Sequence, residues 1–273
     1  MVRTVHSGFV GVVSVIAIGL GMIGCQPAGG DAAASRKALS AAAHKAADQF
    51  VAMAKGSEQT GRAPRQTEAA VAPMLNAVFD TSALDGKPTP RFSEVDPMNE
   101  WMLSAARVGQ VYLFAGTGVT DPTKAADPRV EAQAERNVVT YAPEVGRYID
   151  AELRLVSVLD AMVAQDLAAH PEKTNDPKKA HGLSDIRSGT TTTINSALVT
   201  LATQGLTDDW RLARMPALLG IAPDAARLLN PDEKASLRKT ALAVGDSMSD
   251  ANLKIKLSSF ADAVAPAAAP APT

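Results

Sequence analysis

Hydrophobic residues recur every three or four positions along most of the chain, the spacing of an α-helix that buries one face. Breaks fall at glycines, prolines and polar clusters. The pattern predicts a single all-α domain over residues 35–264, an irregular bundle of about seven or eight helices. In the last helix, after a slip in phase, Leu253, Leu257, Phe260 and Val264 follow at spacings of four, three and four.

Local signals place several helix ends. Asp96, Asp127 and Asn230 each precede a proline, so each is expected to cap a helix whose first residue is that proline. Gly205 is expected to end one helix and Thr207 to open the next. These signals predict a chain of helices joined by short connections.

The expected helix ranges leave one long connection. We expect helices at 35–55, 66–79 and 184–204, and a polar loop at 175–180. The segment 80–95 exceeds the usual length of a connection. It is therefore expected to be either a functional loop or a strap that covers part of the core.

The amino terminus carries the most specific signal. Arg3 is followed by an uncharged run of 16 residues, 9–24, which is shorter than the roughly 20 that span a bilayer. Residues 1–24 therefore look like a signal peptide. The run ends in Met22-Ile23-Gly24-Cys25, which resembles the lipobox of bacterial lipoproteins, although Met22 replaces the usual Leu. A cysteine beside an uncleaved membrane helix is the alternative.

The lipoprotein resemblance implies that Cys25 becomes the first mature residue and carries fatty acyl chains such as palmitate. Two chains hold a protein on a membrane where one does not. The protein would then lie outside the cytoplasm in the cell envelope, with the membrane as its first partner. Gln26 in place of Asp favours the outer membrane in a bacterium with two membranes. Residues 25–34 form the expected flexible tether, and 265–273 a disordered Pro/Ala-rich tail.

Composition excludes several functions. The formal net charge is −2, and a general nucleic-acid binder needs a basic surface, so no nucleic-acid partner is expected. The single cysteine permits neither an intramolecular disulfide nor a cysteine zinc cage. The histidines lack the spacing of a helical zinc site, and no cofactor motif occurs, so we expect neither a metal nor a cofactor.

The segment 148–167 is the best place to look for chemistry. Its apolar residues cover more than half of a helix, which predicts a central position, and Glu152 and Asp160 fall within or beside this apolar arc. Buried carboxyl groups must be paired, hydrogen-bonded or protonated. Either both acids line a cavity, or each pairs with a neighbouring arginine such as Arg107 or Arg136 and fixes the helix register.

Two further groups rank lower. Arg107 and Tyr112, with the glycine turn at 116–118, could border the same cavity, although the turn is more simply a helix C-cap. The charged residues 144, 147, 150 and 154 have the spacing of pairs on one solvated helix face. We therefore take Glu152, Asp160, Arg107, Tyr112 and Arg136 as the ligand-binding candidates, without assigning a catalytic residue.

Three functions remain open. The first is a non-enzymatic envelope lipoprotein that binds an envelope protein or supports a complex, which predicts an exposed apolar or mixed patch. The second is a helical domain that binds a small ligand or lipid in a cavity near Glu152. The third is a hydrolase of an envelope polymer, which needs two acids about 5–10 Å apart in an open cleft. We rank them in this order.

Overall fold

The structure is a computed structural model that describes residues 30–119, 127–171 and 177–265. It confirms the all-α class: these residues form ten α-helices and two short 3₁₀ turns, without a strand. The helices are α1 (Gly30–Met53), α2 (Ser57–Thr60), α3 (Ala72–Phe79), α4 (Val95–Leu113), α5 (Pro128–Thr140), α6 (Ala142–Ala169), α7 (Pro177–Leu201), α8 (Asp208–Leu228), α9 (Pro231–Ser247) and α10 (Ala251–Ala263). The 3₁₀ turns are η2 (Ser82–Leu84) and η3 (Phe92–Glu94).

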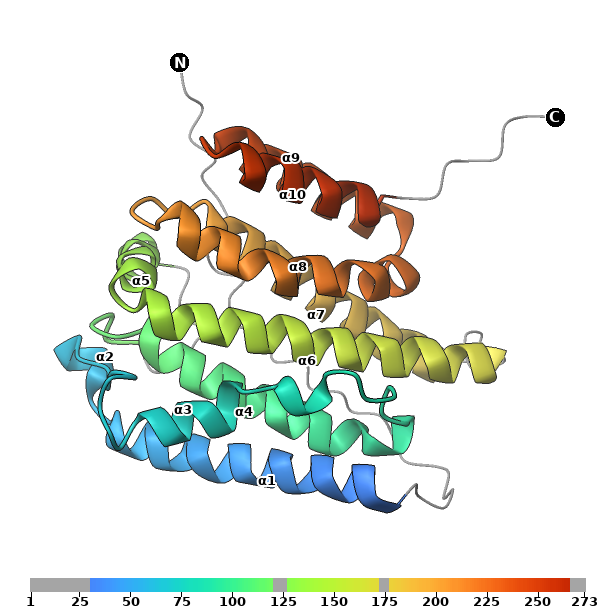
Figure 1. The fold of residues 1–273 in the computed structure, drawn as a ribbon, viewed down its shortest axis with the longest axis horizontal. Helices are drawn as coiled ribbons and strands as arrows, with labels where there is room; N and C mark the ends of the chain where they lie inside the picture. Colours follow the sequence, from blue (N-terminus) through green and yellow to red (C-terminus); the bar gives the residue numbers. More distant parts are fainter. Residues whose placement is uncertain (1–29, 120–126, 172–176, 266–273) are drawn as a thin grey trace.

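The helices stack in successive layers from α1 to the α9–α10 pair (Figure 1). Helix α1 packs against α3 and α4, α4 packs against α6, and α6 packs against α8. Helix α10 joins α8 to α9, while α7 contacts α6, α8 and α9. Helix α6 thus lies between the amino-terminal and carboxy-terminal halves of the bundle.

The central position expected for segment 148–167 is confirmed. On α6, Leu153, Leu155, Leu159 and Met162 are almost completely buried, as the wide apolar arc predicts. Trp101 of α4 is also fully buried. The core is thus continuous through both halves of the bundle and depends on α6 for that continuity.

Three of the predicted helix starts are confirmed by side-chain caps. Asp127 Oδ1 accepts a 2.8 Å hydrogen bond from the backbone N–H of Arg129, and Thr207 Oγ1 accepts one from a backbone N–H at the start of α8. Asn230 and Glu233 form a reciprocal capping box at the start of α9. These caps satisfy backbone donors that a helix start leaves free.

The start expected at Asp96 is wrong. Helix α4 begins at Val95 because the 3₁₀ turn η3 runs directly into it, with Glu94 at the N-cap. The prediction of a single last helix is also wrong: α9 ends at Ser247, and Asp250 caps a separate helix, α10. The slip in phase marks this break between two helices, which is one reason why the count exceeds seven or eight.

Other expected boundaries are displaced. Helix α1 begins at Gly30, so part of the expected tether is helical; Cys25 and residues 1–29 lie outside the described residues. Helix α3 begins at Ala72 instead of 66, and α7 begins at Pro177 within the expected loop. The expected tail is described only at Ala265.

The long connection between α3 and α4 is a strap over the bundle. Its Glu94 accepts hydrogen bonds of 2.7 and 2.9 Å from Arg36 Nε and Nη2 of α1, and both side chains are about nine-tenths buried. Arg154 of α6 donates to the carbonyl oxygen of Leu84 in the same connection. The strap thus joins α1, α4 and α6.

Candidate functional site

The five candidate residues do not converge. Glu152 and Asp160 lie on α6, Arg107 and Tyr112 on α4, and Arg136 on α5. Eight residues of helix separate the two acids, which corresponds to about 12 Å along the axis and a rotation of about 80°. The two carboxyl groups therefore point to different neighbours, and the cavity expected between them is not formed by these side chains.

Asp160 lies where α6, α7 and α8 meet. Its side chain is fully buried, and its Oδ1 accepts a 2.7 Å hydrogen bond from Thr190 Oγ1 of α7. Its Oδ2 has no hydrogen-bond partner within the described segments. Burial raises the pKa of Asp160 to about 8; the hydrogen bond from Thr190 lowers it, and the negative charge of Asp224 on α8 raises it further.

Asp224 is a second acid at this junction, which the sequence analysis did not single out. Its carboxylate accepts a hydrogen bond from Ser157 of α6 and pairs with Arg227, one turn further along α8. Arg227 thus pairs with Asp224, while the hydroxyl of Thr190 is the only hydrogen-bond partner of the Asp160 carboxyl group among the described residues. Of the two acids, one is paired with an arginine, and the other is buried without a cationic partner in the part of the chain that the structure describes.

Glu152 has a separate environment. It is partly buried on α6 and shares a hydrogen bond with the hydroxyl group of Tyr148, one turn earlier. Burial raises the pKa of Glu152 to about 7, against a smaller lowering by this hydrogen bond. Tyr148 itself is buried, and burial together with the charge of Glu152 raises its pKa well above the ordinary value.

The expected arginine partners of these acids are elsewhere. Arg107 Nη2 lies 2.8 Å from Asp48 Oδ1 of α1, and Arg136 Nη2 donates to Gln133 Oε1 at 2.6 Å on its own helix. The prediction that Arg107 or Arg136 neutralises the acids of α6 is therefore wrong. Each arginine instead pairs with a side chain that is at least partly exposed.

Tyr112 has a structural role. It is fully buried, and its hydroxyl donates a 3.0 Å hydrogen bond to the carbonyl oxygen of Pro64. Gly116 and Gly118 both have positive φ, as expected for a turn after the end of α4. Gly116 also lies against the backbone of Gly61, where a Cβ would be crowded. These contacts join the end of α4 to the segment between α2 and α3.

The expected solvated charge pairs on α6 are also wrong, because each charge reaches another element. Glu144 is buried and accepts a hydrogen bond from the backbone N–H of Gln66 at 2.9 Å. Asp150 accepts hydrogen bonds from Arg214 Nε of α8. Helical spacing alone could not distinguish these contacts from pairs along one helix.

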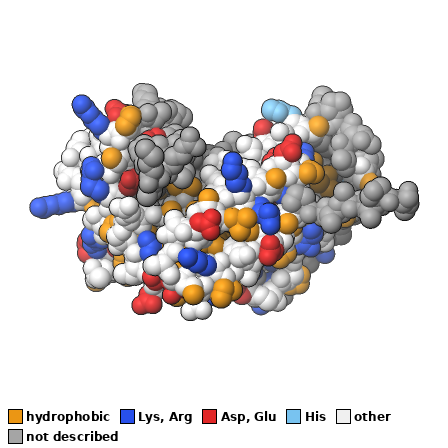
Figure 2. All heavy atoms as spheres, turned by 90° about the horizontal axis from the view of Figure 1, so that it is seen from above, with side chains coloured by type: hydrophobic (Ala, Val, Ile, Leu, Met, Phe, Trp, Pro, Cys, Tyr) orange, Lys and Arg blue, Asp and Glu red, His pale blue; other side chains and the backbone are white. Residues whose placement is uncertain are grey.

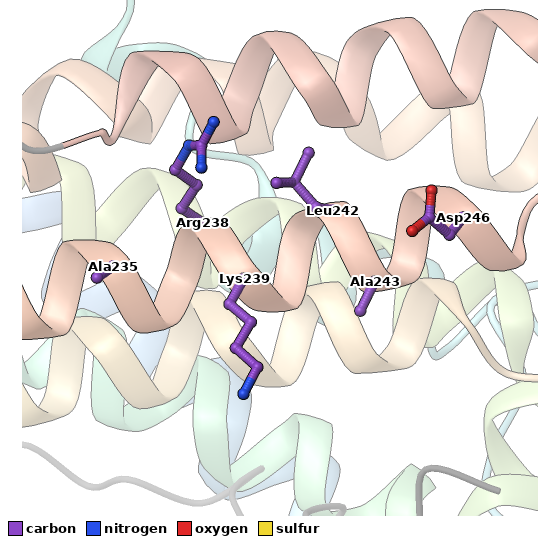
Figure 3. Close-up of a pocket in the computed structure, with 6 residues that line it drawn as sticks. All are labelled: Ala235, Arg238, Lys239, Leu242, Ala243 and Asp246. Carbon is purple, nitrogen blue, oxygen red and sulfur yellow. The ribbon is translucent and has the colours of Figure 1, made fainter. Parts of the chain in front are cut away.

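The described pocket lies on one face of α9 (Figure 3). Arg238 points toward α10, where its Nη2 lies 3.8 Å from Asp262 Oδ1, and Lys239 points to the other side. The lining residues are Ala235, Arg238, Lys239, Leu242, Ala243 and Asp246. All come from a single helix and are mostly exposed, so they form an open surface and not an enclosed site.

The described surface mixes both signs of charge. Figure 2, seen from the side of α9 and α10, shows Lys and Arg interspersed with Asp and Glu and with scattered hydrophobic side chains. The large hydrophobic residues that are exposed in the described segments are Met53, Val139 and Ile255, on α1, α5 and α10. They lie on three separate helices, so these three side chains do not form one apolar patch; the mixed patch that the first hypothesis also allows stays a prediction.

No helix in the described segments has both the length and the hydropathy needed to cross a membrane. Within the same segments, no group of three or more His, Cys, Asp or Glu could hold a metal ion. Comparison of the whole chain with protein-family models, with curated proteins and with solved structures found no significant match.

Proposed function

We propose that this protein is a lipid-anchored, non-enzymatic helical domain of a bacterial cell envelope. The observation that carries the proposal is the short apolar run that ends in Met22-Ile23-Gly24-Cys25, with the only cysteine of the chain at the lipobox position. Acyl chains on Cys25 would hold the domain at the membrane surface. On this view the protein has a binding or structural role in the envelope.

The geometry of the candidate residues supports a role without catalysis. A carboxylate-dependent hydrolase needs two acids that flank an open cleft. Here Asp160 is fully buried, and Glu152 lies about two turns of helix away on another side of α6. Arg107 pairs with Asp48 of α1, and Tyr112 donates a hydrogen bond to Pro64 in the segment between α2 and α3. Asp160, Arg107 and Tyr112 each contact a neighbouring element of the bundle, and the candidates are not gathered around one substrate position.

The surface supports contacts of a polar kind. Both signs of charge are interspersed on the face shown in Figure 2, and charged side chains of this kind could form the polar rim of a protein contact. We therefore expect a partner in the envelope to recognise charged and small polar side chains. Salt should weaken such binding, because exposed charges are screened within about 10 Å at 0.1 M ionic strength.

The anchor is tested by expressing the full chain in a bacterial host and separating membrane from soluble fractions. We expect the protein in the membrane fraction, with an amino-terminal peptide that starts at Cys25 and has the mass of a diacylglycerol adduct. The matched control is Cys25→Ser, which keeps the size of the side chain but cannot form the thioether. An unmodified thiol on a full-length soluble product would refute the proposal.

The non-enzymatic role is tested separately, by crosslinking in intact cells and by assays on the purified protein. Crosslinking should recover an envelope partner, and the same complex, isolated without a crosslinker, should dissociate at high salt. Glu152→Gln should leave this binding unchanged, because the proposal does not use that carboxyl group. Turnover of an envelope polymer by the purified domain, abolished in Glu152→Gln, would contradict the role while leaving the lipid anchor intact.

A further inference from the structure

Asp160 of α6 is joined to α7 by an incomplete set of hydrogen bonds, at the place where α6, α7 and α8 meet. Its Oδ1 accepts from Thr190 of α7, and its Oδ2 is buried without a partner in the part of the chain that the structure describes. Ser157, one turn earlier on α6, binds Asp224 of α8 instead. A fully buried carboxyl group with a free oxygen is stable as a neutral acid and unfavourable as an anion.

The charged groups around Asp160 do not compensate a negative charge. From α8 it faces Asp224, which is itself negative and is paired with Arg227. From α7 it meets the uncharged Thr190, and the nearest arginine on that helix, Arg187, donates to the carbonyl oxygen of Leu183. Within the described segments, loss of the proton would therefore leave Asp160 as an unpaired anion close to a second carboxylate.

Helix α7 has a weak intrinsic preference for its helical conformation. Gly189 is followed by four consecutive threonines, and both residue types disfavour an α-helix. The buried polar side chains of this helix are Thr190, Thr193, Ser196 and Thr200. The buried Ser196 Oγ has no hydrogen-bond partner in the described segments. Low propensity and a polar packing face are the properties of an element that opens locally.

We propose that Asp160 is a buried proton-binding site that couples the docking of α7 to pH. With the proton bound, the neutral carboxyl group fits between α6, α7 and α8. When the proton leaves to solvent, hydration of the carboxylate favours a state in which α7 has moved away from Asp160. The hydrogen bond from Thr190 is lost in that state, and Asp224 keeps its contacts with Ser157 and Arg227.

The direction of the coupling follows from proton linkage. Burial raises the pKa of Asp160 from 3.8 to about 8 in the closed structure, and exposure in the open state restores the ordinary value. Between these two values the closed state binds one proton more than the open state. The equilibrium constant for opening of α7 should therefore rise about tenfold per pH unit from roughly pH 4 to pH 8, and then level off.

Hydrogen–deuterium exchange of the intact protein tests this proposal. Peptides from residues 183–201 are compared with peptides from α4 between about pH 5 and pH 9, after correction for the pH dependence of intrinsic exchange. We expect the α7 amides to be less protected than the α4 amides. Their opening constant should rise about 100-fold between about pH 5 and pH 7 and stay level above about pH 8.

Two variants separate the proposal from a general effect of pH. Asp160→Asn cannot ionise and should remove the pH dependence of the α7 opening constant. Asp185→Asn, on the exposed side of the same helix, should keep this pH dependence. The proposal would be overturned if the pH dependence persists in Asp160→Asn, or if the α7 amides are protected as strongly as the α4 amides at every pH. If Asp160→Asn does not fold, carbon-13 NMR of the Asp160 carboxyl in the wild type decides: titration near pH 4 also overturns it.

Discussion

The aromatic ring of Tyr148 on α6 lies directly against the backbone of Gly109 on α4. A Cβ built at position 109 would be 2.6 Å from Cδ2 of the ring, closer than such atoms approach. The ring is held in place by the core, where it also packs against Phe79 with ring centroids 6.2 Å apart. Glycine at 109 therefore sets how closely α4 approaches the central helix.

Replacing this glycine should separate the two helices. We expect Gly109→Ala to reduce the free energy of unfolding by about 1–3 kcal/mol, because the added methyl group overpacks a closed interface. Gly220→Ala is the matched control: it lies in a helix, α8, with open space around the added Cβ, and should stabilise by up to about 1 kcal/mol. Urea denaturation of both variants measures the difference. Equal stability of the two variants would show that the ring of Tyr148 can shift to accept the added methyl group without loss of stability.

Removing one partner of the ion pair between Arg36 and Glu94 should strongly reduce the free energy of unfolding. Both side chains are about nine-tenths buried and joined by two hydrogen bonds, so Arg36→Met would leave a buried carboxylate without its cation. We expect a loss of about 3–5 kcal/mol for this variant. The double variant Arg36→Met/Glu94→Leu should recover part of the loss, since it leaves no buried charge. A double variant less stable than either single one would contradict this account.

The sequence predicted those parts of the fold that depend on local chemistry. The apolar arc around Leu153 and Leu159 placed α6 at the centre, and the caps at Asp127 and Asn230 placed two helix starts. These features depend on residues within about one turn of each other. The helix start predicted at Asp96 was misplaced, because Glu94 is the N-cap and the helix begins at Val95. Glu94 is bound by Arg36 of α1, a contact between residues far apart in the sequence.

The candidate site depended on contacts between helices, which periodicity does not specify. Sequence spacing identified Asp160 as a buried acid, but not Thr190 or Asp224, which lie 30 and 64 positions away. It offered Arg107 as a possible partner for the acids of the central helix, whereas Arg107 pairs with Asp48 of α1. The charge of a residue and its helix face can be derived from sequence, but its partner depends on how helices pack.

The raised pKa of Glu152 should make the stability of the domain depend on pH. Folding raises this pKa from 4.5 to about 7, so the folded state binds an extra proton between these values. Stability from this residue should fall by up to about 1.4 kcal/mol per pH unit as pH rises through that range, and level off above about pH 7. Burial is the cause of this loss of stability, because burial raises the pKa of Glu152 and the hydrogen bond from Tyr148 lowers it.

The measurement is the urea midpoint of wild type and Glu152→Gln at several values between about pH 4 and pH 9. The difference between the two curves isolates Glu152 from Asp160, whose own effect extends to about pH 8. We expect the difference to change mainly below about pH 7. A constant difference over the whole range would mean that Glu152 titrates near its ordinary value in the folded protein.

The break between α9 and α10 should depend on the cap at Asp250. Its Oδ1 accepts a 2.8 Å hydrogen bond from the backbone N–H of Leu253, which satisfies one free donor at the start of α10. We expect Asp250→Ala to cost about 1 kcal/mol of stability. Asn252→Ala, in the exposed first turn of the same helix, is the control and should change stability by less than about 0.5 kcal/mol. Because α10 joins α8 to α9, hydrogen exchange should show the loss first in these three helices.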